Sequence, residues 1–418
     1  MVNHNGTNGI DNGTKPSDDE LKKSLMLYAK KNLSIEMRLV YLKRDHGWTI
    51  GKETLRKFNK KFEVPSMRKP PPYAISKTLV CEKIVTDVRQ KNGPNAIQWS
   101  LKIDGFLIPR DTIRQIIKEE APESSQFRNP AMQKKKKLHG HLKDVGILEE
   151  AHGDGHEKLG HLALCMGGVG INIYGIRDHA SGKILFLQVV PNDRDECTIG
   201  HVYLDLIEQN GLVIPLQMTV DGGIETGLMY ASHYALRYAQ YFSQSLHPIF
   251  VSLSSTANIS IESIWSYWLK AMGYTLHDII ISGKDKGYFI VGNELHVNLF
   301  SWLWPRIVQH HLENFKEDFN SNKTRYQPNK VLPSGVSPEI VFDFPDRYGL
   351  HYMGCQVEQE AVTALRDGLP RSQKEVYSWV SEDFDHLAQE AYIAIGCPKL
   401  ECDQGWAIFN KILCFLDL

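Results

Sequence analysis

The chain has 418 residues, of which 42% are hydrophobic and 23% are charged. This composition predicts two to three globular domains and excludes a chain that is mostly disordered. No apolar run approaches the ~20 residues that cross a bilayer, and the Asn- and Gly-rich N-terminus lacks the apolar segment of a secretory signal. The seven cysteines lie far apart, which excludes a disulfide framework and favours a reducing compartment.

Charge is distributed unevenly along the chain, although the formal net charge is only −1. Residues 22–143 contain 28 of the 48 Lys and Arg residues, and the part that follows has an acidic excess. We therefore expect the basic part to meet a polyanion. The alternative is a solvated charged face, because residues that cluster in sequence need not cluster in space.

Residues 1–20 are expected to form a disordered tail, and residues 21–69 a first helix-turn-helix unit. A break at His46-Gly47 ends the first helical stretch, and Thr49 is expected to cap a second, basic helix. In DNA-binding units of this kind the second helix meets phosphates and groove edges. The candidate DNA-binding residues on this helix are Lys52, Arg56 and Lys57. Helices that pack only for stability are the alternative.

A second helix-turn-helix unit is expected over residues 73–121, after a proline-rich break. Helical periodicity covers Ile75 to Lys91, and another helix starts at Gly93-Pro94. The candidate DNA contacts on the last helix of this unit are Arg110 and Arg114. The basic linker that follows, residues 122–145, contains Lys134, Lys135, Lys136 and Lys137. These lysines are read as a nuclear localisation signal, as phosphate contacts or as part of a solvated linker, and a nuclear location is expected.

From Gly170 the apolar period changes from helical to strand-like. Two strands joined by a turn at Asp178–Gly182 predict a hairpin. The expected strands lie at 171–176, 184–190, 212–220 and 249–253, and the expected helices at 196–210, 226–241 and 260–273. This order predicts a mixed sheet covered by helices in a core over residues 146–345, followed by a helical extension over residues 346–418.

Three acidic residues occupy suggestive places in this core. Asp221 ends an apolar strand and precedes two glycines, Asp154 lies between glycines, and Glu262 lies one turn into a helix. Clustered carboxylates persist only with cations or protons between them, and hard oxygen ligands suit Mg²⁺ or Mn²⁺. Two such ions about 3.5–4 Å apart can activate a water or a 3′-hydroxyl against a phosphodiester. Each motif alone is weak, since Asp-Gly usually marks a turn.

Several ordered motifs resemble the integrase core domain of the retroviral integrase and DDE-transposase superfamily, in the form found in eukaryotic, especially fungal, transposon-derived proteins. The matching motifs lie at 154–159, 176–185, 221–225 with 233–237, 255–265 and 322–339. Similar proteins carry tandem helix-turn-helix units before the core, so the resemblance covers about three quarters of the chain.

The resemblance implies an α/β RNase H-like core, a mixed five-stranded sheet flanked by helices, preceded by all-α tandem helix-turn-helix units. It further implies metal-dependent DNA strand transfer with two Mg²⁺ or Mn²⁺ ions, element ends and target DNA as partners, no membrane and a homo-oligomer. The residues it assigns as catalytic metal ligands are Asp154, Asp221 and Glu262. The supporting neighbours it assigns are His156, Lys158, Glu225 and Asn258.

The sequence departs from the family pattern around these acids. The stretch before Asp154 is polar rather than apolar, and residues 160–168 lengthen the loop after it. Two functions therefore stay open: a polynucleotidyl transferase of the integrase or transposase type, and a domesticated, catalytically inactive DNA-binding or assembly protein. A general RNase H-like nuclease is a third, but it does not explain the tandem helix-turn-helix units.

Overall fold

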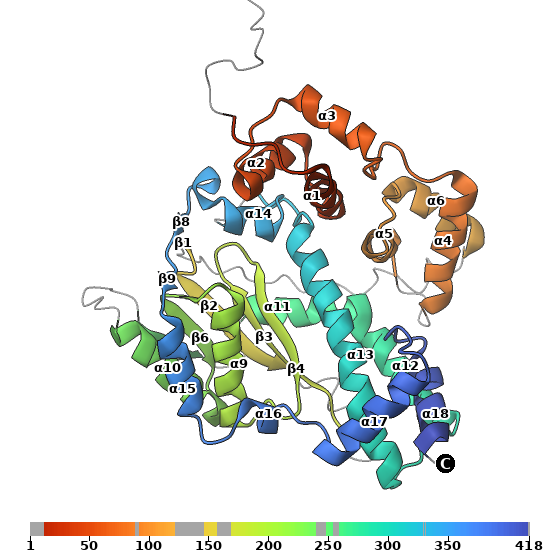
Figure 1. Cartoon of the computed structure of the whole chain (residues 1–418), viewed down its shortest axis with the longest axis vertical. Coiled ribbons are helices and arrows are strands. Elements are labelled where there is room, and N and C mark those ends of the chain that lie inside the picture. The colour runs from red at the N-terminus through yellow and green to blue at the C-terminus, as the bar shows by residue number, and fades with distance from the viewer. Residues whose placement is uncertain are drawn as a thin grey trace, which may run out of the picture. The chain divides into compact units, whose positions relative to one another are not determined.

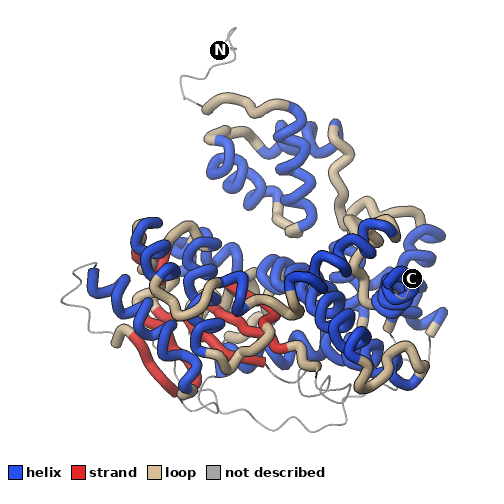
Figure 2. The backbone as a smooth tube through the Cα atoms, turned by 60° about the horizontal axis from the view of Figure 1, so that its bottom comes forward, coloured by secondary structure: helices blue, strands red, loops and turns tan. Residues whose placement is uncertain are grey.

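A computed structural model of the chain describes residues 12–87, 92–121, 146–156, 169–239, 248–253, 259–328, 330 and 332–416. It divides into two compact units, residues 1–132 and 133–418. The named elements of the first unit are all helices, whereas the second unit contains the strands (Figure 1, Figure 2). In the described ranges, no helix combines the length and the apolar character that a bilayer crossing requires.

The first unit contains two successive groups of three helices. They are α1 (Asp18–Lys30), α2 (Ile35–His46), α3 (Lys52–Lys61), α4 (Tyr73–Thr86), α5 (Pro94–Ile103) and α6 (Arg110–Glu120). A capping box starts α1, because Ser17 accepts from the backbone N–H of Glu20 and the Glu20 carboxylate accepts from the backbone N–H of Ser17. The helix thus begins within the segment predicted as a tail, of which residues 1–11 lie outside the described ranges.

Two predicted helix ends in this unit need correction. Gly47 does end α2, with φ 62° in the left-handed region that favours glycine. The predicted cap at Thr49 is wrong: Gly51 is the N-cap of α3, and the backbone N–H of Thr49 donates to the carbonyl of Asn12 at 2.8 Å. Helix α4 stops at Thr86, short of the predicted Lys91.

The second group of three helices has its own apolar core. Its buried residues recur at helical spacing on α5 and α6, as the sequence period predicts. They are Val80, Ile97, Leu101, Ile108, Ile113, Ile116 and Ile117. The turn between α5 and α6 contains Gly105, whose φ of 86° again requires a left-handed backbone.

A five-stranded mixed sheet forms the centre of the second unit. Its strands are β2 (Glu150–His156), β3 (Asn172–Asp178), β4 (Ile184–Val190), β6 (Gln217–Asp221) and β7 (Phe250–Leu253). The order across the sheet is β4-β3-β2-β6-β7. Strand β3 runs antiparallel to β2 and β4, while β2, β6 and β7 are mutually parallel. If these five strands are numbered 1 to 5 in chain order, their order across the sheet is 3-2-1-4-5, and the second strand is antiparallel to the others. This is the RNase H-like arrangement, so the predicted fold class is confirmed.

One predicted strand is divided in two. The apolar run 212–220 contains β5 (Val213–Ile214) and then β6, with Pro215 between them. Proline has no N–H to donate to a ladder, so the chain leaves one pairing and starts another. Strand β5 pairs with β9 (Cys355–Gln356), and β1 (Gly146–Ile147) pairs with β8 (His351–Tyr352).

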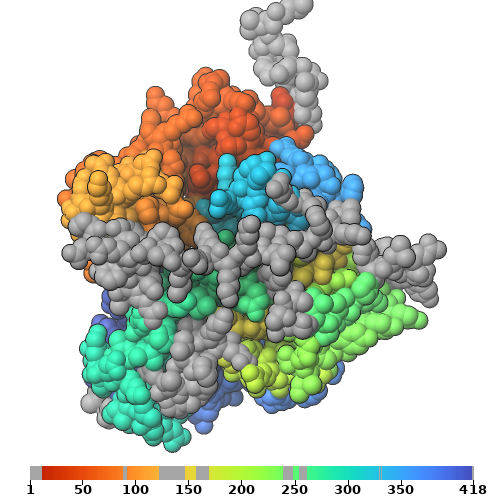
Figure 3. Space-filling model, turned by 180° about the vertical axis from the view of Figure 1, so that it is seen from behind, coloured from red at the N-terminus to blue at the C-terminus, as the bar shows by residue number. Residues whose placement is uncertain are grey.

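Helices cover both faces of the five-stranded sheet (Figure 1). On one face, α9 (Glu196–Gln209) and α10 (Gly227–Ala239) pack in a core that includes Ile176 and Val220. On the other, α11 (Ile259–Trp268) and α13 (Glu294–Ser321) pack in a core that includes Ile173, Leu187 and Trp265. Viewed from behind, the outer side of α10 is visible in green at the surface (Figure 3).

The remaining elements surround these layers. They are the 3₁₀ helices η2 (Ile224–Thr226) and η4 (Pro345–Tyr348), the π-helical turn η3 (Leu269–Gly273), and α12 (Tyr274–Asp285), α14 (Pro338–Asp343), α15 (Gln359–Asp367), α16 (Gln373–Val376), α17 (Glu382–Ala394) and α18 (Gly405–Leu416). The segment predicted as a helical extension, residues 346–418, thus also supplies the strands β8 and β9.

Candidate active site

The three predicted acids come from three elements that meet at one edge of the sheet. Asp154 is the fifth residue of β2, Asp221 is the last residue of β6, and Glu262 lies in the first turn of α11. Strands β2 and β6 are parallel, and both acids lie one residue beyond the last paired positions, Gly153 and Val220. Their side chains therefore leave the same face of adjacent strands.

An open cleft of about 1080 Å³ lies in front of these residues. Its lining includes all three acids together with Asp193 and Glu225. The predicted neighbour Glu225 is therefore at the site, whereas Lys158 and Asn258 lie outside the described residues.

The carboxyl group of Asp154 has a strongly shifted pKa. Burial raises its pKa to about 7, the Trp265 hydrogen bond opposes this rise, and the Asp221 and Glu262 carboxylates add to it. Because both acids act on the pKa of Asp154, each of them lies within electrostatic reach of Asp154. A carboxylate in such surroundings is stabilised by a bound cation or a proton.

Two aromatic groups hold Asp154 in place. The Trp265 indole N–H donates to Asp154 Oδ2 at 2.8 Å, and the ring is buried. His156 stacks on the same indole, with ring centroids 4.8 Å apart and an interplanar angle of 13°. The predicted neighbour His156 thus supports the site through Trp265. The helical spacing of Trp265 predicts only that the ring lies in the core. The hydrogen bond to Asp154 gives the same ring a second role, that of orienting the carboxylate.

One carboxylate of the cleft, Asp193, was missed by the sequence reasoning. Strand β4 runs in the same direction as β2 and β6, so the residues after its carboxyl end reach the same edge. A Cβ built on Gly155 would lie 2.8 Å from Asp193 Oδ2, so the glycine leaves room for the Asp193 carboxylate beside β2. The available signal was an acid that follows an apolar strand, the same signal that identified Asp221.

The donor set of the cleft fits hard divalent cations. Carboxylate oxygens around an open space suit Mg²⁺ or Mn²⁺ better than thiophilic metals. In the described part of the chain, the ligand atoms of Asp154, Asp221 and Glu262 do not all lie within 4.8 Å of one another, whereas those of Glu150, His152 and His179 do. A site for two ions about 3.5–4 Å apart would not require the three acids to lie this close together, because no single ion would need all three of them.

The predicted DNA-binding residues of the first unit lie on two helices. Lys52, Arg56 and Lys57 belong to α3, and Arg110 and Arg114 to α6; all five are exposed. Three of them form ion pairs with acids: Lys52 with Glu36, Arg56 with Glu53, and Arg114 with Asp111. These pairs reduce the local positive charge. Residues 134–137 lie outside the described ranges.

Two solved structures resemble the chain in part. The crystal structure of the Mos1 strand transfer complex is 9% identical, covers 61% of this chain and 90% of its own, and has a TM-score of 0.18. A pre-cleavage Mos1 transpososome is 8% identical, covers 65% and 98%, and has a TM-score of 0.17. No protein-family model matches, and no curated protein matches. The strand order of the five-stranded sheet is that of the RNase H-like fold, and an all-helical region precedes this sheet in the chain.

Proposed function

We propose that this chain is a metal-dependent polynucleotidyl transferase of the integrase or transposase type, which cuts and joins DNA. The observation that carries the proposal is the convergence of Asp154, Asp221 and Glu262 on one cleft of an RNase H-like sheet. The proposal includes element ends and target DNA as substrates, a homo-oligomeric assembly and a nuclear location.

The three acids share one role in this proposal. The Asp221 and Glu262 carboxylates both raise the pKa of Asp154, and the three acids together would hold the divalent ions. When bound, Mg²⁺ or Mn²⁺ supplies Lewis acidity and lowers the pKa of an attacking water or 3′-hydroxyl. Trp265 restricts rotation of the Asp154 carboxylate by donating to Oδ2, and His156 in turn restricts the indole.

The test is nicking of supercoiled plasmid by the full-length protein. We expect nicking that requires Mg²⁺ or Mn²⁺, stops with a chelator and is lost in Asp221→Asn. The matched control is Asp346→Asn, which changes an exposed acid of η4 outside the cleft lining and should leave nicking unchanged. Equal nicking by the wild type and Asp221→Asn would overturn the proposal.

DNA binding by the helical unit is tested separately. Affinity for duplex DNA should fall steeply with salt, because neutralised phosphates release counterions. Lys57 is exposed on α3, so Lys57→Ala should reduce the salt slope by about one. A salt-independent affinity in an anisotropy titration would contradict this part of the proposal.

A catalytically inactive DNA-binding or assembly protein is the second candidate. It is favoured by the separation of the three acids, whose ligand atoms are not a group within 4.8 Å among the described residues. This protein would bind DNA with the same salt dependence and would not nick plasmid under any divalent ion. The two assays together therefore separate the candidates.

A further inference from the structure

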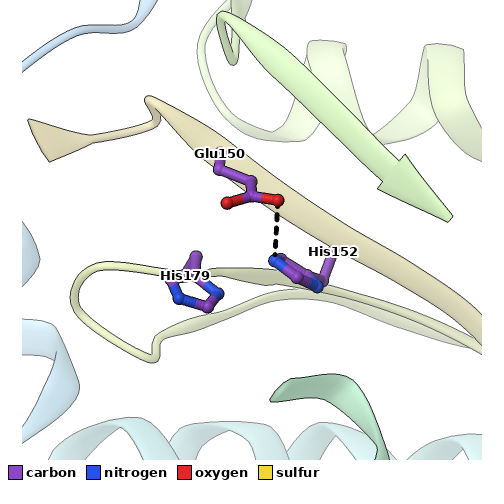
Figure 4. A group of neighbouring side chains, drawn as sticks. All are labelled: Glu150, His152 and His179. Carbon is purple, nitrogen blue, oxygen red and sulfur yellow. Dashed lines mark ion pairs between the residues drawn. The ribbon is translucent and has the colours of Figure 1, made fainter. Parts of the chain in front are cut away.

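A second cluster of metal-ligand residues lies on β2, away from the residues that line the acidic cleft. It consists of Glu150, His152 and His179, which each offer one ligand atom within 4.8 Å of the others (Figure 4). His152 Nε2 lies 3.2 Å from Glu150 Oε1, and the two imidazole rings stack with centroids 4.6 Å apart. Both histidines are buried.

The sheet register brings these residues together. Glu150 and His152 are two residues apart on β2, so their side chains share one face. The backbone N–H of His179 donates to the Glu150 carbonyl at 3.0 Å, which extends the β2–β3 pairing into the turn. Asp178 fixes that turn, because its carboxylate accepts from the backbone N–H groups of Leu148 and Ser181 and from the Ser181 hydroxyl.

Neighbours on β6 orient the carboxylate of Glu150. The Thr219 hydroxyl donates to Glu150 Oε1 at 2.6 Å, and the Gln217 amide donates to the same oxygen at 3.0 Å. These residues pair across the sheet with His152 and Glu150, respectively. Outer hydrogen bonds of this kind fix ligand orientation in metal sites, and their loss typically weakens metal binding about 10–100-fold.

The donor set distinguishes among metals. Two imidazole nitrogens and one carboxylate oxygen suit Zn²⁺ and related transition metals, with bonds of about 2.0–2.2 Å and a fourth position for water. Ligand atoms around such an ion lie roughly 3.3 Å apart in tetrahedral geometry. Small side-chain rotations would close the present separations to that value.

The surrounding charges also favour a transition metal over Mg²⁺. The ammonium group of Lys330 lies within electrostatic reach of the His179 ring. Arg177, opposite His152 on β3, donates to the Gly182 carbonyl and the Ser263 hydroxyl. The positive charges of Lys330 and Arg177 disfavour a metal ion held by electrostatics alone, such as Mg²⁺. Metal binding at this cluster therefore depends on the bonds to imidazole nitrogen.

We propose that Glu150, His152 and His179 bind one Zn²⁺-type transition-metal ion, which ties β2 to the turn between β3 and β4. The ion's position is separate from the acidic cleft, and the proposal does not depend on DNA chemistry. If no metal binds, the cluster is a stacked histidine pair that contributes only packing and the contact between His152 Nε2 and Glu150 Oε1.

The test uses the metal-stripped full-length protein and ZnCl₂ as the probe. Competition with a chromophoric chelator should give one Zn²⁺ per chain, not displaced by MgCl₂. His179→Gln should weaken this binding at least about 100-fold, and Thr219→Val, which removes only the outer hydroxyl, about 10–100-fold. CoCl₂ should produce the intense visible bands of a four- or five-coordinate ion with nitrogen ligands, a measurement that needs no variant.

Two variants serve as controls. Asp221→Asn should lose plasmid nicking and keep Zn²⁺ binding, so this proposal and the proposed function can fail independently. His351→Gln removes an exposed histidine of β8 and should also keep Zn²⁺ binding. Wild-type affinity in Thr219→Val and His179→Gln, a weak six-coordinate Co²⁺ spectrum, or the absence of stoichiometric Zn²⁺ would each overturn the proposal.

Discussion

The two ends of strand β2 carry different chemistry on the same face of one sheet. At one end, Asp154 meets Asp221 and Glu262 at an open cleft of about 1080 Å³ lined by carboxylate oxygens. At the other, Glu150 and His152 meet His179 in a mostly buried cluster with nitrogen donors. His152 and Asp154, two positions apart on one strand, thus belong to an enclosed, mixed-ligand set and an open, hard-ligand set, respectively.

The two ends of β2 differ in their access to solvent and in the ligand atoms that they offer. An open cleft admits a substrate and lets metal-bound water exchange, whereas an enclosed ion or ion pair mainly ties neighbouring segments together. Changes at the open end should therefore alter activity, and changes at the closed end should alter stability and metal retention. Four predictions examine this comparison.

Glu262→Gln should have the largest effect, and on activity alone. Loss of one metal ligand costs several kcal/mol of transition-state stabilisation, on the order of a 10³-fold lower nicking rate. Glu262 is exposed, so the free energy of unfolding should change by no more than about 0.5 kcal/mol. Plasmid nicking rates and urea unfolding curves measure both quantities. Retained nicking would remove Glu262 from the site.

Asp154→Asn should stabilise the metal-free protein at neutral pH. Burial raises the pKa of Asp154 to about 7, so its contribution to stability is present below about pH 4 and is lost as the pH rises through 7. At pH 8 the substitution should raise the free energy of unfolding by roughly 2–4 kcal/mol, and at pH 3 by nearly nothing. Mg²⁺ should stabilise the wild type and not the variant. An equal change in the free energy of unfolding at both pH values would show that the pKa of Asp154 is not raised in the folded protein.

The sequence predicts the strands and the acid at a strand end better than it predicts where a strand is interrupted. Period-two apolar residues and a turn at Asp178–Gly182 predicted the hairpin, and β3 and β4 confirm it. Asp221 was found because an acid that ends a buried strand is a local signal. The break at Pro215 was missed because the apolar run continues through it, although proline cannot donate to the ladder.

Contacts that depend on register were beyond sequence reasoning. Glu150 and His152 belonged only to the polar stretch before Asp154, and His179 to a predicted turn. Their convergence follows from the pairing of β2 with β3 and from the bond between His179 and the Glu150 carbonyl. Likewise, no local pattern indicates that Trp265 donates to Asp154, since that contact joins residues 111 positions apart.

Gly175→Ala should disturb the acidic cleft through Trp265, the residue that donates to Asp154. A Cβ at this position would lie 2.7 Å from Trp265 Cη2 and 2.9 Å from Leu187 Cδ2. Overpacking of this kind costs about 1–3 kcal/mol and displaces the ring that donates to Asp154, so nicking should also fall. Gly368→Ala is the control, because its nearest contact would be 3.4 Å and its φ is −79°. Unchanged stability and nicking in Gly175→Ala would mean that the indole position tolerates adjustment.

His179 should give the closed end the opposite pH dependence, about 1.4 kcal/mol per pH unit at most. Its pKa is lowered by burial from 6.5 to about 4, so its contribution to stability is complete above pH 6.5 and is lost as the pH falls toward 4. His179→Gln should therefore flatten the acid limb of the stability curve, measured by urea unfolding with a chelator present. His233 and His311, whose pKa values burial also lowers, should keep the remaining slope in the variant. Asp154→Asn removes a contribution of the opposite sign between pH 4 and 7. If Asp154→Asn and His179→Gln changed the pH dependence of the free energy of unfolding in the same direction, the proposed difference between the two ends of β2 would be wrong.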